Sequence, residues 1–367
     1  MRLFALLLAA LSLLAGCTPR PGIAVSAEAA QLGTELPVYV GTTRKDGDER
    51  LFGNARGAQV SFARVDVSVP PVHEPGRIEA ASPQPDPARH FMASRVVRHA
   101  DAADFRADLA RALARRPRAE REALIYVHGF NNTFADGVFR AAQMGHDFEM
   151  PGVMVHYSWP SGAKPLGYAY DRDSVLYARD GLVALIEEVK RAGAERVLLA
   201  GHSLGAHLSM EALRQIALKR GGVGGLVDSA VLISPDIDID VFRSQARTIG
   251  ALPQPFVIFA SQRDRALALS ARLSGEGNRL GNLKTVQQVA DLQVIVIDVS
   301  AYSGGDWFNH LTIGQSPALI RLFSNIQALE PAFGRDMAGR TGLLPGTVLT
   351  VQNATAIILS PVSALVQ

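Results

Sequence analysis

The stretch VLLAGHSLGAHLSMEAL (Val197–Leu213) runs from an apolar segment, through a serine placed between two glycines, into a pattern with helical spacing. A G-x-S-x-G motif at such a strand-to-helix junction is typical of a nucleophile elbow. Side chains at Gly201 or Gly205 would keep the strand and the helix apart, so the glycines permit a turn tight enough to expose the serine. We therefore interpret Ser203 as a nucleophile rather than as a serine that caps a glycine-rich turn.

A serine nucleophile needs a histidine that accepts its proton and a carboxylate that orients the histidine. In this arrangement the chain order is serine, acid, histidine. His310 is the only histidine beyond His207, and it is therefore the expected base. Asp264 follows the apolar run PFVIFAS and is the favoured acid. Asp236 follows AVLIS one expected strand earlier and stays as the alternative, although its run PDID also suits a helix cap.

Acyl transfer also requires backbone donors for a developing oxyanion, and two segments offer them. The amide of Leu204 follows the serine at the start of a helix. The stretch IYVHGFNNTF lies in the loop after an early strand, where the amide of Phe130 would point at the site. We interpret His128 in the same stretch as a hydrogen-bond partner that stabilises the loop.

From Ala123 onward, apolar runs alternate with helical segments. The runs are continuously apolar, as in strands of a parallel sheet that is covered on both faces. The pattern predicts an α/β fold with a mostly parallel, doubly wound sheet and helices on both faces. The expected strands are ALIYVHG, GVMVHYSW, RVLLAGH, DSAVLIS, PFVIFAS and LQVIVIDV, and the clearest helices span residues 174–191 and 204–220.

The N-terminus MRLFALLLAALSLLAGC has a basic start, an apolar run and small residues before the chain's only cysteine. The run is too short for a permanent membrane span and predicts a secretory signal peptide over residues 1–16. LLAGC resembles the lipobox of bacterial lipoproteins, which implies a lipid on Cys17. Thr18 stands where aspartate would indicate inner-membrane retention, so we favour an outer-membrane anchor with the protein facing the periplasm.

Composition and motifs limit the other partners. The chain has 367 residues with 37 basic and 35 acidic side chains, and this near-balance argues against a nucleic-acid surface. Sequence motifs for a metal or a nucleotide are not apparent, and His146 and His156 lie too far apart in the chain to suggest a ligand set. We therefore expect no cofactor and no metal. The oligomeric state is left open.

Six stretches occur together in an order that is specific: YVHGFNNTF, YSWPSGA, YAYDRDSV, AGHSLGAHL, ISPDIDIDVF and FASQRDRALALSARLSGEGNRLG. With VYVGTTR and VSVPPVHEPG they resemble an uncharacterised bacterial alpha/beta hydrolase family over roughly residues 38–323. The resemblance implies the alpha/beta-hydrolase fold and a triad of Ser203, Asp264 and His310. One departure is Asn309, because members of the family often carry glycine before the histidine. The family has no agreed substrate.

The expected organisation is a signal peptide (1–16), a tether (17–35), an alpha/beta hydrolase domain with an N-terminal strand extension (36–329) and a C-terminal extension (330–367). The expected function is acyl transfer to water by a lipid-anchored serine hydrolase. A small-molecule carboxylester or a lipid ester is the favoured substrate. The alternative is a non-catalytic interaction module of the cell envelope that retains the hydrolase fold.

Overall fold

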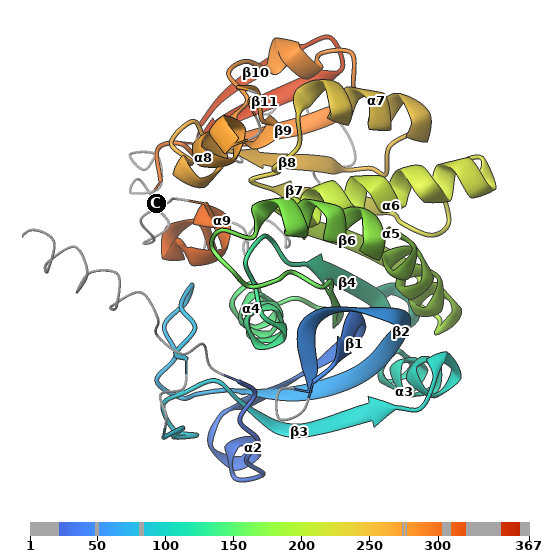
Figure 1. The fold of residues 1–367 in the computed structure, drawn as a ribbon, viewed down its shortest axis with the longest axis vertical. Coiled ribbons are helices and arrows are strands. Elements are labelled where there is room, and N and C mark those ends of the chain that lie inside the picture. The colour runs from blue at the N-terminus through green and yellow to red at the C-terminus, as the bar shows by residue number, and fades with distance from the viewer. Residues whose placement is uncertain are drawn as a thin grey trace, which may run out of the picture.

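One mixed sheet organises the protein (Figure 1). The computed structural model describes residues 22–47, 51–80, 84–273, 275, 277–302, 310–320 and 346–359. Within this part of the chain the sheet has 11 strands in the order β10-β11-β9-β8-β7-β6-β4-β5-β1-β2-β3. The expected signal peptide and Cys17 lie outside the described residues.

The centre of the sheet consists of six parallel strands, of which five fall within the expected apolar runs and the sixth, β4, starts one residue before its run, at Glu122. Most of their residues are buried, which explains why the runs are continuously apolar. The strand predictions for this region are confirmed. The strands are β4 (Glu122–Val127), β5 (Val153–Ser158), β6 (Arg196–His202), β7 (Ser229–Ile233), β8 (Phe256–Ala260) and β9 (Val294–Asp298).

Helices cover both faces of this sheet and divide the interior into two cores. Successive residues of a strand point to opposite faces, so Ile125 belongs to one core and Tyr126 to the other. Figure 1 shows α5, α6 and α7 on one side of the sheet and α4 and α9 on the other. The doubly wound α/β fold is therefore confirmed. The helices are α3 (Ala102–Ala114), α4 (Phe134–Asp147), α5 (Tyr168–Arg191), α6 (Leu204–Arg220), α7 (Ile239–Ile249), α8 (Arg265–Leu273) and α9 (Thr312–Gln315).

Three N-terminal strands extend the sheet at one edge, namely β1 (Thr34–Asp46), β2 (Phe52–Val69) and β3 (Met92–His99). β1 runs parallel to β5 and antiparallel to β2. The expected tether is partly packed on this extension. Ser26 N donates to Ala93 O at 2.9 Å, and Ala29 in the short helix α2 (Ala29–Leu32) is buried. The small side chains of the expected tether are typical of a free linker, but they also allow its backbone to lie close to the sheet.

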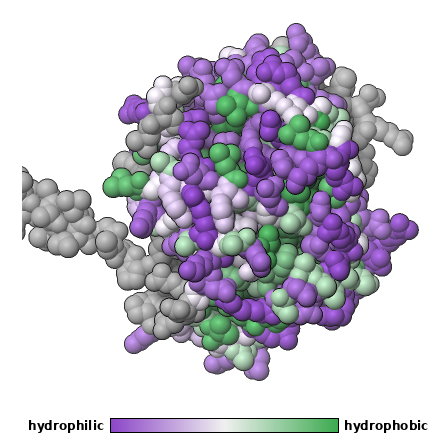
Figure 2. Space-filling view, turned by 45° about the vertical axis from the view of Figure 1, so that its right-hand side comes forward, coloured by the Kyte–Doolittle hydropathy of each residue, from purple (hydrophilic) through white to green (hydrophobic). Residues whose placement is uncertain are grey.

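The C-terminal residues extend the opposite edge. β10 (Gly346–Val351) and β11 (Ala354–Leu359) form an antiparallel pair, and β11 lies parallel beside β9. The described part of the expected C-terminal extension is therefore part of the same sheet. No helix within the described residues has both the length and the apolar character needed to cross a membrane. The face drawn in Figure 2 is mainly hydrophilic, with hydrophobic residues in small separate groups.

Candidate active site

Ser203 occupies a strained turn between β6 and α6. Its backbone has φ 55° and ψ −122°, a region that side-chain-bearing residues rarely adopt. A Cβ atom on Gly201 would lie 2.7 Å from Ala206 Cα, and one on Gly205 would lie 2.3 Å from the His128 carbonyl oxygen. The two flanking glycines are thus required by close backbone approach. This is the tight geometry that the motif led us to expect.

Asp264 and His310 lie side by side although 46 residues separate them in the chain. His310 Nδ1 is 2.7 Å from Asp264 Oδ2. The other carboxylate oxygen accepts a hydrogen bond from Leu267 N at 3.0 Å, in the first turn of α8. The Asp264 side chain is fully buried, whereas 17% of the His310 side chain is exposed. When Nδ1–H donates to this fixed carboxylate, the ring carries its lone pair on Nε2, which is then the atom that can accept a proton.

His202, which precedes the serine, holds the backbone at His310. Its Nε2 lies 3.2 Å from the His310 carbonyl oxygen, and the two ring centroids are 4.7 Å apart. Burial lowers the pKa of His202 well below its usual value, and the neighbouring His310 lowers it further. The ring is therefore neutral and donates its proton to the carbonyl. The sequence motif gave no indication of this positioning contact.

Asp236, the alternative acid, is held by a different set of groups. Tyr168 and Ser270 donate hydrogen bonds to its two oxygens, each at 2.8 Å. Arg279 Nε lies 3.2 Å from Oδ1, and both side chains of this ion pair are buried. Burial, followed by the charge of Asp236, raises the pKa of Tyr168 to about 12, so the phenol remains a donor. Asp236 N also donates to Ser203 O at 3.3 Å, which places this cluster beside the elbow.

The helix cap expected in the run PDID belongs to Asp238. Its side chain accepts hydrogen bonds from Asp240 N and Val241 N at the start of α7. Asp238 has the extended backbone of an N-cap residue, whereas Asp236 lies two residues earlier and faces the interior.

The loop after β4 lies against the elbow. A Cβ atom on Gly129 would stand 2.9 Å from Ser203 Cβ and 2.7 Å from His202 Nδ1. Phe130, the expected oxyanion residue, is therefore next to a glycine that touches the serine. Leu204 is the first residue of α6. The Phe130 ring packs against Tyr168 with 5.6 Å between centroids. Tyr168 therefore contacts both this loop and Asp236.

A buried arginine from β1 organises the same loop. Arg44 is 1% exposed and donates through Nη2 to Asn132 O at 2.8 Å, and through Nη1 to Ser161 O at 3.2 Å. Its Nη2 also lies 3.3 Å from His128 Nε2, while His128 Nδ1 lies 2.9 Å from Gly129 O. Burial lowers the pKa of Arg44 to about 10, which still leaves it charged at neutral pH. The sequence signal for this contact is a single cation that directly follows the strand-like stretch VYVGTT.

Asp171, from the first turn of α5, completes the support of this loop. Its carboxylate accepts hydrogen bonds from Ser161 Oγ at 2.5 Å, Gly162 N at 2.7 Å and Asn131 N at 3.2 Å. Burial raises the pKa of Asp171, while the charge of Arg44 opposes that shift. The loop that carries Phe130 is thus held from both sides by buried charged groups.

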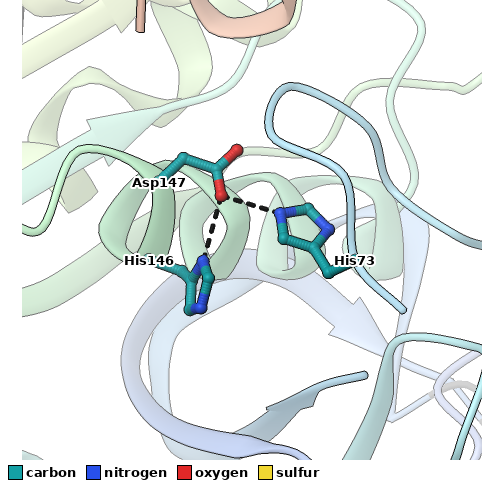
Figure 3. A group of neighbouring side chains, drawn as sticks. All are labelled: His73, His146 and Asp147. Atoms are coloured by element: carbon teal, nitrogen blue, oxygen red, sulfur yellow. Dashed lines mark hydrogen bonds and ion pairs between the residues drawn. The ribbon is translucent and has the colours of Figure 1, made fainter. Parts of the chain in front are cut away.

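Histidines far apart in the sequence also meet elsewhere in the protein. We expected no metal site because His146 and His156 are separated in the chain. The structure instead brings His146 and Asp147, at the end of α4, beside His73 from the loop after β2 (Figure 3). The sequence could not indicate this group, because its third member comes from another element.

Comparison with known proteins identifies a family. A family model described as "Alpha/beta hydrolase of unknown function (DUF900)" matches residues 101–327, a segment that contains Ser203, Asp264, His310 and the Phe130 loop. No curated protein matches the chain.

Several solved structures are similar at low sequence identity. A putative hydrolase from Agrobacterium vitis S4 is 13% identical, with a TM-score of 0.38 over 76% of this chain and 96% of that chain. Est1E from Butyrivibrio proteoclasticus, solved with ferulic acid, is 12% identical, with a TM-score of 0.36 over 59% of this chain and 92% of that chain. A Pyrobaculum calidifontis esterase is 12% identical, with a TM-score of 0.35 over 83% and 88% of the two chains.

Proposed function

This chain belongs to the family of alpha/beta hydrolases of unknown function, and from that premise we propose that it is a serine hydrolase with Ser203, Asp264 and His310 as its triad. The observation that carries the proposal is the 2.7 Å contact between His310 Nδ1 and the buried Asp264 carboxylate. The strained elbow at Ser203 supports the same assignment, because the cost of such a backbone is usually tolerated where function needs it.

In the proposed reaction, Ser203 Oγ attacks the carbonyl carbon of an ester while His310 Nε2 takes the hydroxyl proton. The negative charge that develops on the carbonyl oxygen is stabilised by the amides of Phe130 and Leu204. His310 then gives the proton to the departing alcohol, which leaves an acyl group on Ser203. Water attacks this acyl-enzyme by the same steps and releases the carboxylic acid. Asp264 keeps the ring in the tautomer that each step requires.

A carboxylester is the proposed substrate class. Phe130 and Tyr168 supply an aromatic wall beside the elbow, which suits an apolar acyl or alcohol group.

The proposed lipid on Cys17 would hold the enzyme at the outer membrane with access to lipid esters from the periplasmic side. Mass spectrometry of the membrane-bound protein should find an acylated Cys17, and Cys17→Ser should abolish acylation. An unmodified N-terminus elsewhere in the mature chain would contradict the anchor.

Hydrolysis of p-nitrophenyl esters of increasing acyl length tests the enzymatic proposal. Ser203→Ala should lower kcat by at least ~10⁴-fold, because the serine acts together with its base as a unit. Ser209→Ala is the matched control, since this buried serine lies in α6, the helix that begins directly after Ser203, and donates to the Gly205 carbonyl oxygen. The control should keep its activity. Equal turnover by wild type and a folded Ser203→Ala variant would contradict the serine mechanism, and a folded wild type without turnover would favour the non-catalytic interaction module.

A further inference from the structure

We propose that His73, His146 and Asp147 form a binding site for a divalent first-row metal ion, best suited to Zn²⁺ (Figure 3). The site lies between the end of α4 and the loop that joins β2 to β3, and none of its three residues belongs to the proposed triad. The inference does not depend on the proposed hydrolase activity.

Three ligand atoms already converge. Asp147 Oδ1 lies 2.7 Å from His73 Nε2 and 3.0 Å from His146 Nδ1, and one ligand atom from each residue lies within 4.8 Å of the others. In a tetrahedral zinc site with bonds of about 2.0–2.1 Å, neighbouring ligand atoms are about 3.3 Å apart. Outward shifts of a few tenths of an ångström at the two hydrogen bonds would therefore admit an ion.

The remaining polar atoms of the two buried ligands are also held. Both ring nitrogens of His73 face carboxylate oxygens, Nδ1 at 2.9 Å from Glu79 Oε2 and Nε2 at 2.7 Å from Asp147 Oδ1. A bound ion would replace the proton between Nε2 and Asp147, while Nδ1 still donates to Glu79. Asp147 Oδ2 accepts hydrogen bonds from Gly76 N and Gln143 Nε2, both at 2.6 Å. Metal-binding histidines and carboxylates are oriented by outer partners of this kind.

Burial and donor type indicate which ion would fit. The His73 and Asp147 side chains are 4% and 0% exposed, whereas that of His146 is 34% exposed, so the proposed site is open to solvent at His146. An ion could enter past His146 and take water as a fourth ligand. Two imidazole nitrogens and one carboxylate suit Zn²⁺, while Ca²⁺ and Mg²⁺ prefer sets made of oxygen atoms.

The ion would stabilise the packing of the segment that follows His310. Gly76, which donates to Asp147, packs against α9 so closely that a Cβ atom there would lie 2.5 Å from Gln315 O. Arg140 donates to Gly76 O and Gly314 O, each at 3.5 Å. An ion that crosslinks this loop to α4 would therefore stiffen the support beneath α9, a structural role that leaves the chemistry at Ser203 unchanged.

Equilibrium dialysis against ZnCl₂ with metal analysis tests the site directly. The full-length chain is used in a Cys17→Ser background, which removes its single thiol, with a tag that lacks histidine and after stripping with a chelator. We expect one zinc per chain, and a melting temperature that rises with zinc because the ion binds only the folded state. Magnesium should give neither effect.

His146→Ala should weaken zinc binding at least ~10-fold and abolish the thermal shift, while ester hydrolysis at 25 °C is preserved. This variant keeps the buried His73–Asp147 pair and so should still fold. His90→Ala is the matched control, because His90 lies between β2 and β3, as His73 does, and its Nδ1 accepts a hydrogen bond from Asp86 N at 3.0 Å. Failure of the stripped wild type to take up zinc, or equal binding by His146→Ala and wild type, would overturn the proposal. Since the readout is bound metal, an inactive enzyme would not affect the result.

Discussion

The loops after β7 and β8 each place a buried aspartate at the same edge of the sheet, yet their surroundings differ. Asp236 is paired with Arg279 and bonded by Tyr168 and Ser270. Asp264 faces His310 and accepts a hydrogen bond from the backbone amide of Leu267 in α8. Position at the carboxyl edge of a parallel sheet therefore marks both residues as candidates, and only the partner that each one meets tells them apart.

The difference has an electrostatic basis. The Asp236 charge is already balanced by a buried cation, and removing one member of such a pair leaves the other unpaired at high cost. Asp264 has no arginine among these contacts, so its charge is available to stabilise the imidazolium that forms on His310 during the reaction. We therefore expect Asp264 to matter for turnover and Asp236 to matter for stability.

Asp264→Asn should have the largest effect on activity of the variants that keep Ser203. An asparagine cannot hold His310 in the productive tautomer, and we expect kcat to fall on the order of 10⁴-fold. The measurement is p-nitrophenyl ester hydrolysis at a temperature well below the melting transition. If Asp236→Asn is the inactive variant and Asp264→Asn turns over normally, the acid has been assigned to the wrong strand.

Arg44→Lys should have the next largest effect. Lysine keeps the charge but cannot make the forked contacts to Asn132 O and Ser161 O that hold the Phe130 loop. Loosening one oxyanion donor should lower kcat by ~10–100-fold with little change in KM. Arg56→Lys is a control on β2, since Arg56 donates to Ser174 Oγ and the Tyr170 carbonyl oxygen in α5 rather than to the carbonyl oxygens that Arg44 bonds. A kcat equal to that of the control would show that Arg44 does not position the oxyanion donor of the Phe130 loop.

Asp236→Asn should lower kcat/KM by only ~10-fold, mainly through KM, because the cluster lines the wall beside Phe130. It should instead destabilise the fold by about 3 kcal/mol, since the buried Arg279 charge loses its ion pair with Asp236. Urea unfolding measures the loss. Replacing Arg279 with methionine in the same chain should recover much of it, and a double variant no more stable than Asp236→Asn would show that the ion pair is not the cause.

The smallest expected effect concerns the elbow itself. Ser203→Gly relieves a backbone that costs about 1–3 kcal/mol for a residue with a side chain, against about 0.5–1 kcal/mol for the greater freedom of unfolded glycine. Ser203→Gly should therefore melt about 1–3 °C above Ser203→Ala, although both lack the nucleophile. A lower melting temperature for the glycine variant would mean that the turn is not strained.

The sequence was sufficient to predict the parallel strands and the tight turn at Ser203. Continuous apolar runs reflect burial on both faces of the sheet, and the glycines around Ser203 reflect the close approach of strand and helix. Chain order alone predicts His310 as the base, and the structure places it against Asp264, while its catalytic role stays a prediction. The sequence was not sufficient for contacts between distant elements. Arg44 reaches from β1 to a loop some 90 residues later, and the partner of Asp236 is an arginine beyond β8. Such pairs leave no local periodicity, so neither their partners nor the meeting of His73 with Asp147 could be predicted.

The most direct test of the central claim is fluorophosphonate labelling followed by intact-mass and peptide mapping. An activated serine reacts covalently with this probe, whereas an ordinary hydroxyl does not. We predict one adduct per chain on Ser203 in the wild type, no adduct in Ser203→Ala, and unchanged labelling in the Ser209→Ala control. Equal labelling of wild type and Ser203→Ala, or a folded wild type that does not react, would contradict the account.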